Sequence, residues 1–102
     1  MFYNRENKPI NPKEWAELLE LPGYKRVART EFQNGWTVST VWIGLSVAPF
    51  GRPLIFETMV FDNEGPRNKR QYFTEAEALK GHKEAVTIIE KELRKLHGKR
   101  RD

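Results

Sequence analysis

The feature that most constrains this chain is a regular apolar stripe near its carboxyl end. Residues of one helix face recur there three or four positions apart: Leu79, His82, Val86, Ile89, Leu93 and Leu96. Just before them, Thr74–Glu77 has the pattern of a capping box, whose two end side chains satisfy free amides of the first helical turn. The sequence therefore predicts a helix of about six turns ending near His97, and this helix needs an apolar surface to cover.

The middle of the chain predicts three β-strands for this helix to cover. Residues 24–32 alternate roughly between apolar and polar, and Gln33-Asn34-Gly35 is typical of a tight hairpin turn. Residues 36–47 form a β-branched and aromatic run, and residues 54–61 form a third strand. The segments 48–53 and 62–70 contain Gly and Pro and are predicted to be loops.

A second capping box predicts a short helix near the amino end. Asn11 can cap this helix, and the Glu14 side chain can accept a hydrogen bond from the Asn11 backbone amide. Pro12 suits the first turn, and Leu21-Pro22-Gly23 ends the helix. Residues 2–10 are predicted to be irregular. The expected order is α-β-β-β-α: an α+β fold with an antiparallel three-stranded β-meander, a short N-terminal helix and a long C-terminal helix.

Both faces of the predicted sheet carry apolar residues. Alternation places one set, Val41, Ile43 and Leu45, opposite another, Trp36, Val38, Thr40 and Trp42. One long helix covers one face only. Either the short helix and the N-terminal segment cover the other face, or that face is a binding surface or a homodimer interface.

Length and composition predict one domain, residues 1–97, followed by a basic tail, residues 98–102. The chain has 102 residues and no Cys, which excludes disulfide-stapled and zinc-ribbon modules. It shows neither a membrane-spanning apolar run nor a signal peptide at its start, so we expect a soluble intracellular protein. The net charge of +4 comes from the last nine residues, because the first 93 are balanced.

The sequence offers no equipment for catalysis or metal binding. His82 and His97 lie roughly 22 Å apart on one predicted helix and cannot share a metal ion. Ser39 and Ser46 occupy strand positions, not a nucleophile turn, and no Gly-rich phosphate loop leads from a strand into a helix. We therefore expect a non-enzyme with no catalytic residue, metal or cofactor.

The candidate partner-binding residues are polar or aromatic side chains in the predicted sheet and beside it: Trp36, Thr40, Trp42, Arg52, Glu57 and His82. A mid-strand carboxylate such as Glu57 needs a partner, for which His82, Arg29 and Arg52 are the candidates. A Glu57–His82 pair is either a satisfied contact in the core or a ligand-orienting pair at a pocket mouth. Gly81, inside the predicted helix, indicates close approach of a Trp ring or a strand.

Nucleic-acid binding is the alternative function. Its candidate residues are the cations of the predicted loop and tail, together with exposed aromatic side chains: Arg67, Lys69, Arg70, Lys99, Arg100 and Arg101. Charges in such places are also common on plain solvated loops and tails.

Three segments carry a resemblance to a known family: residues 38–45 (VSTVWIGL), 53–61 (PLIFETMVF) and 72–82 (YFTEAEALKGH). With them, the chain resembles a family of small proteins from tailed bacteriophages, especially those of actinobacteria. The resemblance implies a phage origin and the host cytoplasm, and it assigns no catalytic residue. We expect a phage accessory protein that binds a host protein, such as a defence or regulatory factor, or sequesters a small ligand.

Overall fold

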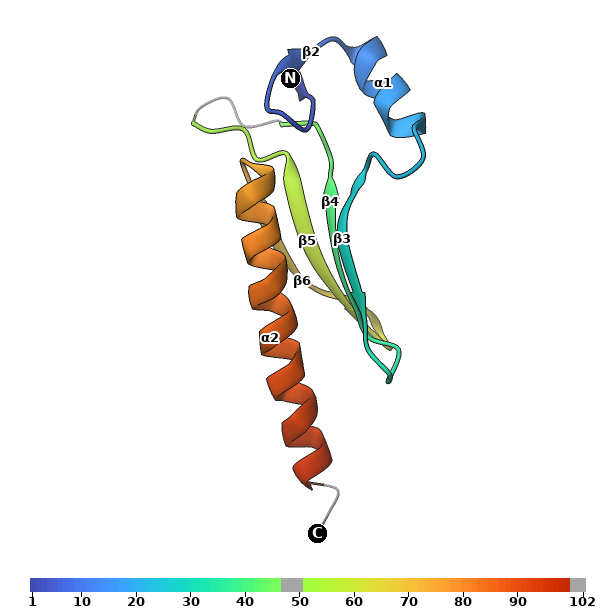
Figure 1. The fold of residues 1–102 in the computed structure, drawn as a ribbon, viewed down its shortest axis with the longest axis vertical. Coiled ribbons are helices and arrows are strands. Elements are labelled where there is room, and N and C mark those ends of the chain that lie inside the picture. Colours follow the sequence, from blue (N-terminus) through green and yellow to red (C-terminus); the bar gives the residue numbers. More distant parts are fainter. Residues whose placement is uncertain (47–50, 100–102) are drawn as a thin grey trace.

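The computed structural model describes residues 1–46 and 51–99 and has an α+β fold (Figure 1). The elements in chain order are β1 (Phe2–Tyr3), β2 (Pro9–Ile10), α1 (Pro12–Glu20), β3 (Arg26–Glu31), β4 (Thr37–Trp42), β5 (Phe56–Asp62), β6 (Gly65–Tyr72) and α2 (Glu75–Lys99). The long helix α2 runs along one face of the sheet, and α1 lies beyond one end of it (Figure 1). Within the described ranges, no helix is long and apolar enough to cross a membrane.

The main sheet has four antiparallel strands in the order β3-β4-β5-β6, one more than the sequence predicts. The additional strand, β6, occupies most of the segment 62–70 that was predicted to be a loop. This prediction was wrong because β6 is an edge strand whose residues Pro66–Gln71 are all exposed. Such a strand shows no apolar alternation, and the Pro at its start is compatible with an edge.

The local signals at the turns and helix starts are confirmed. Gly35 has a φ of +91° in the turn between β3 and β4, where its amide donates to the Phe32 carbonyl at 2.9 Å. Asn11 and Glu14 form both bonds of a capping box at α1. Thr74 and Glu77 do the same at α2.

Two predicted boundaries shift. The segment 2–10 is not wholly irregular, because β1 and β2 pair antiparallel. The helix α2 continues to Lys99, so the predicted tail starts with two helical residues. Residues 100–102 and the segment 47–50, part of the predicted 48–53 loop, lie outside the described residues.

The core lies between α2 and one face of the sheet. It is built by alternate residues of β4 and β5, together with small and medium residues of α2: Val38, Thr40, Trp42, Phe56, Thr58, Val60, Ala78, His82, Ala85 and Ile89. The two ends of the predicted apolar stripe are not buried as expected, since Leu79 and Leu96 are 39% and 45% exposed. The buried side of α2 uses Ala78 and Ala85 instead, because small residues let the helix approach the sheet closely.

Gly81 has the close neighbour that its position in a helix predicts, although the ring is that of Tyr72 and not of a Trp. A Cβ at position 81 would overlap the Tyr72 ring. The tyrosine hydroxyl is buried and has no hydrogen-bond partner among the described residues. Close packing of α2 on β6 therefore offsets the cost of a helical Gly, about 1 kcal/mol.

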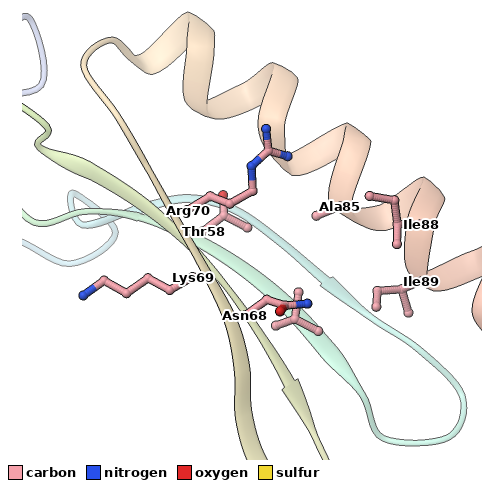
Figure 2. A pocket seen from close by; sticks show the side chains of 8 residues that line it. Thr58, Asn68, Lys69, Arg70, Ala85, Ile88 and Ile89 are labelled. Atoms are coloured by element: carbon pink, nitrogen blue, oxygen red, sulfur yellow. The ribbon is translucent and has the colours of Figure 1, made fainter.

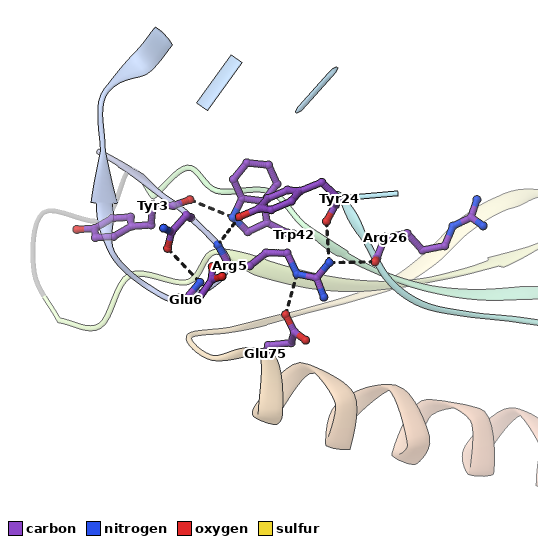
Figure 3. Close-up of polar contacts among 8 residues, drawn as sticks. Tyr3, Arg5, Glu6, Tyr24, Arg26, Trp42 and Glu75 are labelled. Atoms are coloured by element: carbon purple, nitrogen blue, oxygen red, sulfur yellow. Dashed lines mark hydrogen bonds and ion pairs between the residues drawn. The ribbon is translucent and has the colours of Figure 1, made fainter. Parts of the chain in front are cut away.

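Arg5 fastens the N-terminal segment to both layers of the molecule (Figure 3). Its Nε donates to Glu75 Oε1 at 2.7 Å and its Nη1 to the Tyr24 carbonyl at 2.9 Å. The hydrogen bond to Glu75 raises the pKa of the Arg5 guanidinium. The Trp42 indole donates to the Tyr3 carbonyl at 3.0 Å. These contacts hold the N-terminal segment at the end of the sheet. Within residues 1–46 and 51–99, no helix runs along the face opposite α2 (Figure 1).

Candidate functional site

The face of the sheet opposite α2 is the candidate functional site, and we call it the open face. Its central residues come from alternate positions of β4 and β5: Thr37, Ser39, Val41, Glu57, Met59 and Phe61. The register pairs Ser39 with Met59 and Thr37 with Phe61. Val41, Met59 and Phe61 thus form a diagonal apolar band across the two central strands, and each of the three is half-buried.

Charged side chains of both signs border the apolar band. On β3, Arg29 lies 3.0 Å from Glu31 in an exposed ion pair. At the other edge, Lys69 of β6 lies 3.2 Å from Glu57, whose side chain is only 15% exposed. The open face is therefore an apolar strip between two ion pairs, with no excess of one charge in these pairs.

A shallow hollow extends the open face towards α1. It is lined by the last two residues of α1, the residues that follow it, and β3 and β4: Leu19, Glu20, Leu21, Pro22, Gly23, Lys25, Arg26, Arg29, Ser39 and Val41. Leu21 is 51% exposed. The loop after α1 therefore borders the apolar band without covering it.

The predicted aromatic residues lie on the other face, under α2. Trp42 and Thr40 are fully buried, and Trp36 packs against the core beneath the Arg67 guanidinium, 5.0 Å from its ring. The alternation of side chains along the predicted strand correctly placed Trp36, Thr40 and Trp42 on the face opposite Val41. It could not show which set the long helix covers, because both sets are apolar.

Glu57 and His82 do not form the predicted pair. Glu57 lies on the open face with Lys69, whereas His82 projects from α2 into the core on the opposite side of the sheet. The partner of Glu57 is thus neither His82 nor the two arginines named from the sequence. Because an eight-residue strand was predicted as a loop, Lys69 could not be placed beside Glu57.

His82 is the centre of a buried hydroxyl network. Its Nε2 lies 2.9 Å from Thr30 Oγ1 and its Nδ1 lies 2.8 Å from Thr40 Oγ1. Thr40 Oγ1 in turn lies 2.6 Å from Thr58 Oγ1. Burial lowers the pKa of His82, which favours the neutral ring. These contacts satisfy a buried imidazole and hold it away from solvent.

Arg52 is separate from the other predicted binding residues. It lies 2.9 Å from Glu77 at the start of α2, and its guanidinium is 4.4 Å from the centre of the Phe73 ring. Both side chains of the Arg52–Glu77 pair are well exposed. The hydrogen bonds from Thr74 lower the pKa of Glu77.

The cations of the nucleic-acid alternative point to different sides. Arg67 contacts Glu92 of α2 at 3.1 Å, and Arg70 lies on the same side, 5.8 Å from the Tyr72 ring. Lys69 lies on the open face with Glu57. Lys99 is the last described helical residue, and Arg100 and Arg101 lie outside the described residues. Residues 67–70 thus do not present their cations as one surface.

Met59 and Phe61 are the residues that the site prediction missed. Period-two alternation along residues 56–61 separates them from Phe56, Thr58 and Val60, so the sequence contained the signal that could have found them.

In the described ranges, no group of three or more His, Asp or Glu side chains is placed to hold a metal ion. No protein-family model matches the chain, and neither a curated protein nor a solved structure matches it significantly.

Proposed function

We propose that this protein acts by binding a partner protein on its open face and does not catalyse a reaction. The observation that carries the proposal is the half-buried apolar band of Val41, Met59 and Phe61, which lies on the sheet face opposite α2. Among the described residues, no helix packs along this band. A contiguous apolar strip of this kind is typical of an interaction surface.

The chemistry of the open face indicates the kind of partner. An apolar centre with a polar, charged rim is the usual anatomy of a protein–protein interface. The rim contains Glu31 and Glu57 as well as Arg29 and Lys69. We therefore propose a partner with an apolar centre and charges of both signs around it.

The resemblance to bacteriophage proteins supports a host protein as this partner, with the host cytoplasm as the compartment. A phage accessory protein that blocks a defence or regulatory factor needs a binding surface and no catalytic group. A second copy of the chain and a small sequestered ligand are the competing occupants, and the experiment below separates them.

The test is site-specific photo-crosslinking followed by measured binding. A photoreactive residue replaces Met59 on the open face or, as a control, exposed Lys83 on α2. In an actinobacterial extract we expect a protein captured from position 59 and not from position 83. Titration of that purified protein should show binding weakened at least about tenfold by Met59→Glu, because a charge would enter the apolar centre.

Several outcomes would contradict the proposal. Equal capture from both positions, or unchanged affinity in Met59→Glu, would exclude the open face as the site for a host protein. A dimer detected by light scattering and dissociated by Met59→Glu would make a second copy the occupant. Capture of no protein, together with a metabolite that co-purifies and is lost in Met59→Glu, would make a small ligand the occupant.

Nucleic-acid binding is less well supported, because the cations of residues 67–70 lie on two sides and two of them contact carboxylates. A salt titration distinguishes it. Affinity that depends on phosphate contacts falls steeply between low and moderate salt, whereas binding on the open face should change little. Removal of residues 98–102 should matter only for nucleic acid.

A further inference from the structure

We infer that the outer edge of β6, with the groove between β6 and α2, is a second docking site, which takes an extended acidic segment of another protein as an added strand. This site shares Lys69 with the rim of the open face, but it does not depend on the open face being a binding surface. Addition of a strand to a free sheet edge is a common mode of peptide recognition, with main-chain bonds for affinity and neighbouring pockets for specificity.

The edge strand β6 provides the template for such an addition. It is the last strand in the order β3-β4-β5-β6, it is eight residues long, and its residues Pro66–Gln71 are all exposed. Each edge strand has one irregularity in its pairing, β3 between Arg26 and Ala28 and β6 between Pro66 and Asn68, but the opposite edge, β3, is shorter, with six residues. Of the two edges, β6 therefore offers the longer row of main-chain donors and acceptors.

A groove runs beside this edge, between β6 and α2 (Figure 2). It has a volume of about 210 Å³ and is lined by Thr58, Val60, Asn68, Lys69, Arg70, Ala85, Ile88 and Ile89. Its apolar wall includes Ile88, which is 59% exposed. An apolar side chain of an added strand can enter this groove, because successive side chains of a strand point to alternate sides.

The charges of β6 favour an acidic segment. The strand contains Arg67, Lys69 and Arg70 and no acidic residue. Arg70 points towards α2, whereas Lys69 points away (Figure 2). Two of the three cations are engaged, Arg67 with Glu92 and Lys69 with Glu57.

Arg70 is the cation available to a carboxylate of the added strand. Within residues 1–46 and 51–99, no carboxylate lies within ion-pair distance of its guanidinium. On the α2 side, Glu92 is neutralised by Arg67, and Glu84 lies one turn before Ile88. The expected segment therefore places an acidic side chain at Arg70 and an apolar one against Ile88.

The same charges argue against self-pairing as the use of this edge. Two β6 strands side by side would bring cations opposite cations, and like charges directly opposite each other destabilise a strand pair. Charged residues on an edge are a known protection against pairing with another copy. An acidic strand reverses the sign of this interaction and is attracted.

The test is selection from a displayed library of random 12-residue peptides on the immobilised protein. We expect enriched peptides in which acidic and apolar residues alternate. The best peptide, as a synthetic probe, should shift the amide NMR signals of residues 66–72 more than those of the open face. Alternate backbone nitrogens of the probe face opposite edges of the added strand. N-methylation of the set that faces β6 should abolish binding because the main-chain donors are lost, whereas N-methylation of the other set should not.

Variants of the protein decide the roles of the two side chains. Arg70→Glu and Ile88→Glu should each weaken the probe at least about tenfold, since they reverse the charge and fill the groove entrance. Lys13→Glu, at an exposed cation of α1, is the matched control and should change affinity less than about twofold. Unfolding midpoints close to that of the unsubstituted protein establish that both variants are folded.

Three results of the selection and of the affinity measurement would each overturn the inference. These are the absence of enriched peptides, enrichment without an excess of Asp and Glu, and affinity unchanged in Arg70→Glu. Peptide signals confined to Val41, Met59 and Phe61 would also overturn it and would assign the peptide to the open face instead. None of these results depends on the host partner of the open face.

Discussion

The two faces of the same four strands differ in burial and in how their polar groups are satisfied. On β4, Thr40 and Trp42 are fully buried under α2, while their neighbours Ser39 and Val41 lie half-buried on the open face. Polar groups on the covered face bond to one another, as in the contact between Thr40 and His82. Those on the open face form ion pairs in contact with solvent, such as Lys69–Glu57.

This difference teaches where stability and binding are located in the molecule. Removal of a buried side chain leaves a cavity and unsatisfied partners, so the covered face should tolerate little change. In the part of the chain that the structure describes, no helix packs along the open face, so its side chains can change with a small effect on folding. Matched substitutions on the two faces test this separation.

The largest contrast is expected between two aromatic residues. Trp42→Ala should lower the free energy of unfolding by about 3–5 kcal/mol, because it empties the centre of the core. Phe61→Ala on the open face should lower it by less than about 1 kcal/mol. Urea unfolding monitored by circular dichroism measures both. Equal losses would mean that the open face is also part of the core.

Close packing on the covered face is tested at Gly81. Gly81→Ala should destabilise the protein by about 1–3 kcal/mol, although Ala is the better helix former, because its methyl group overlaps the Tyr72 ring. Thermal unfolding measures the change. In a Tyr72→Leu background the same substitution should cost much less. A stabilised Gly81→Ala single variant would refute the close contact.

Substitutions of Thr40 and Ser39, which are adjacent in β4, compare a polar side chain on the covered face with one on the open face. Thr40→Val should cost about 1–2 kcal/mol, since it leaves His82 Nδ1 and Thr58 Oγ1 without their partner. Ser39→Val should change stability by no more than about 0.5 kcal/mol. Denaturant midpoints of the two variants decide the comparison, and it fails if Ser39→Val is the more damaging.

The smallest effect is a pH dependence confined to the covered face. Burial lowers the pKa of His82, so below about pH 6.5 the unfolded chain takes up a proton that the folded protein resists. Stability should therefore decline as the pH falls from about 6.5 through the lowered pKa of the folded state. His82→Gln should remove this part of the decline in urea titrations between pH 5 and 8. Parallel profiles for both proteins would contradict it.

The elements with strong local signals could be predicted from the sequence. Both capping boxes, the Asn34–Gly35 turn and the strands β3, β4 and β5 follow from residues that act on their immediate neighbours. The strand β6 could not be predicted, because its stability comes from pairing with β5 and not from its own apolar pattern. A tertiary contact is the only reason for this element to be a strand.

The site was predictable only in part, because alternation divides a strand into two sets without saying which set is covered. Trp36 and Trp42 were expected to bind a partner, and they pack under α2 instead. On that side α2 packs through the buried small residues Ala78 and Ala85, and the N-terminal residues Tyr3 and Trp15 pack against the same core. Arg5 was not singled out, since its bond to Glu75 joins residues 70 positions apart.

The simple strand order has a consequence during synthesis on the ribosome. Each strand of the sheet pairs with the one that emerged just before it, so the sheet can assemble while translation continues. The helix that shields Trp42 and Phe56 emerges only afterwards. For that interval the apolar side of the sheet lacks the 25-residue helix that completes its cover, and transiently exposed apolar surface of this kind makes a partly folded chain prone to aggregation.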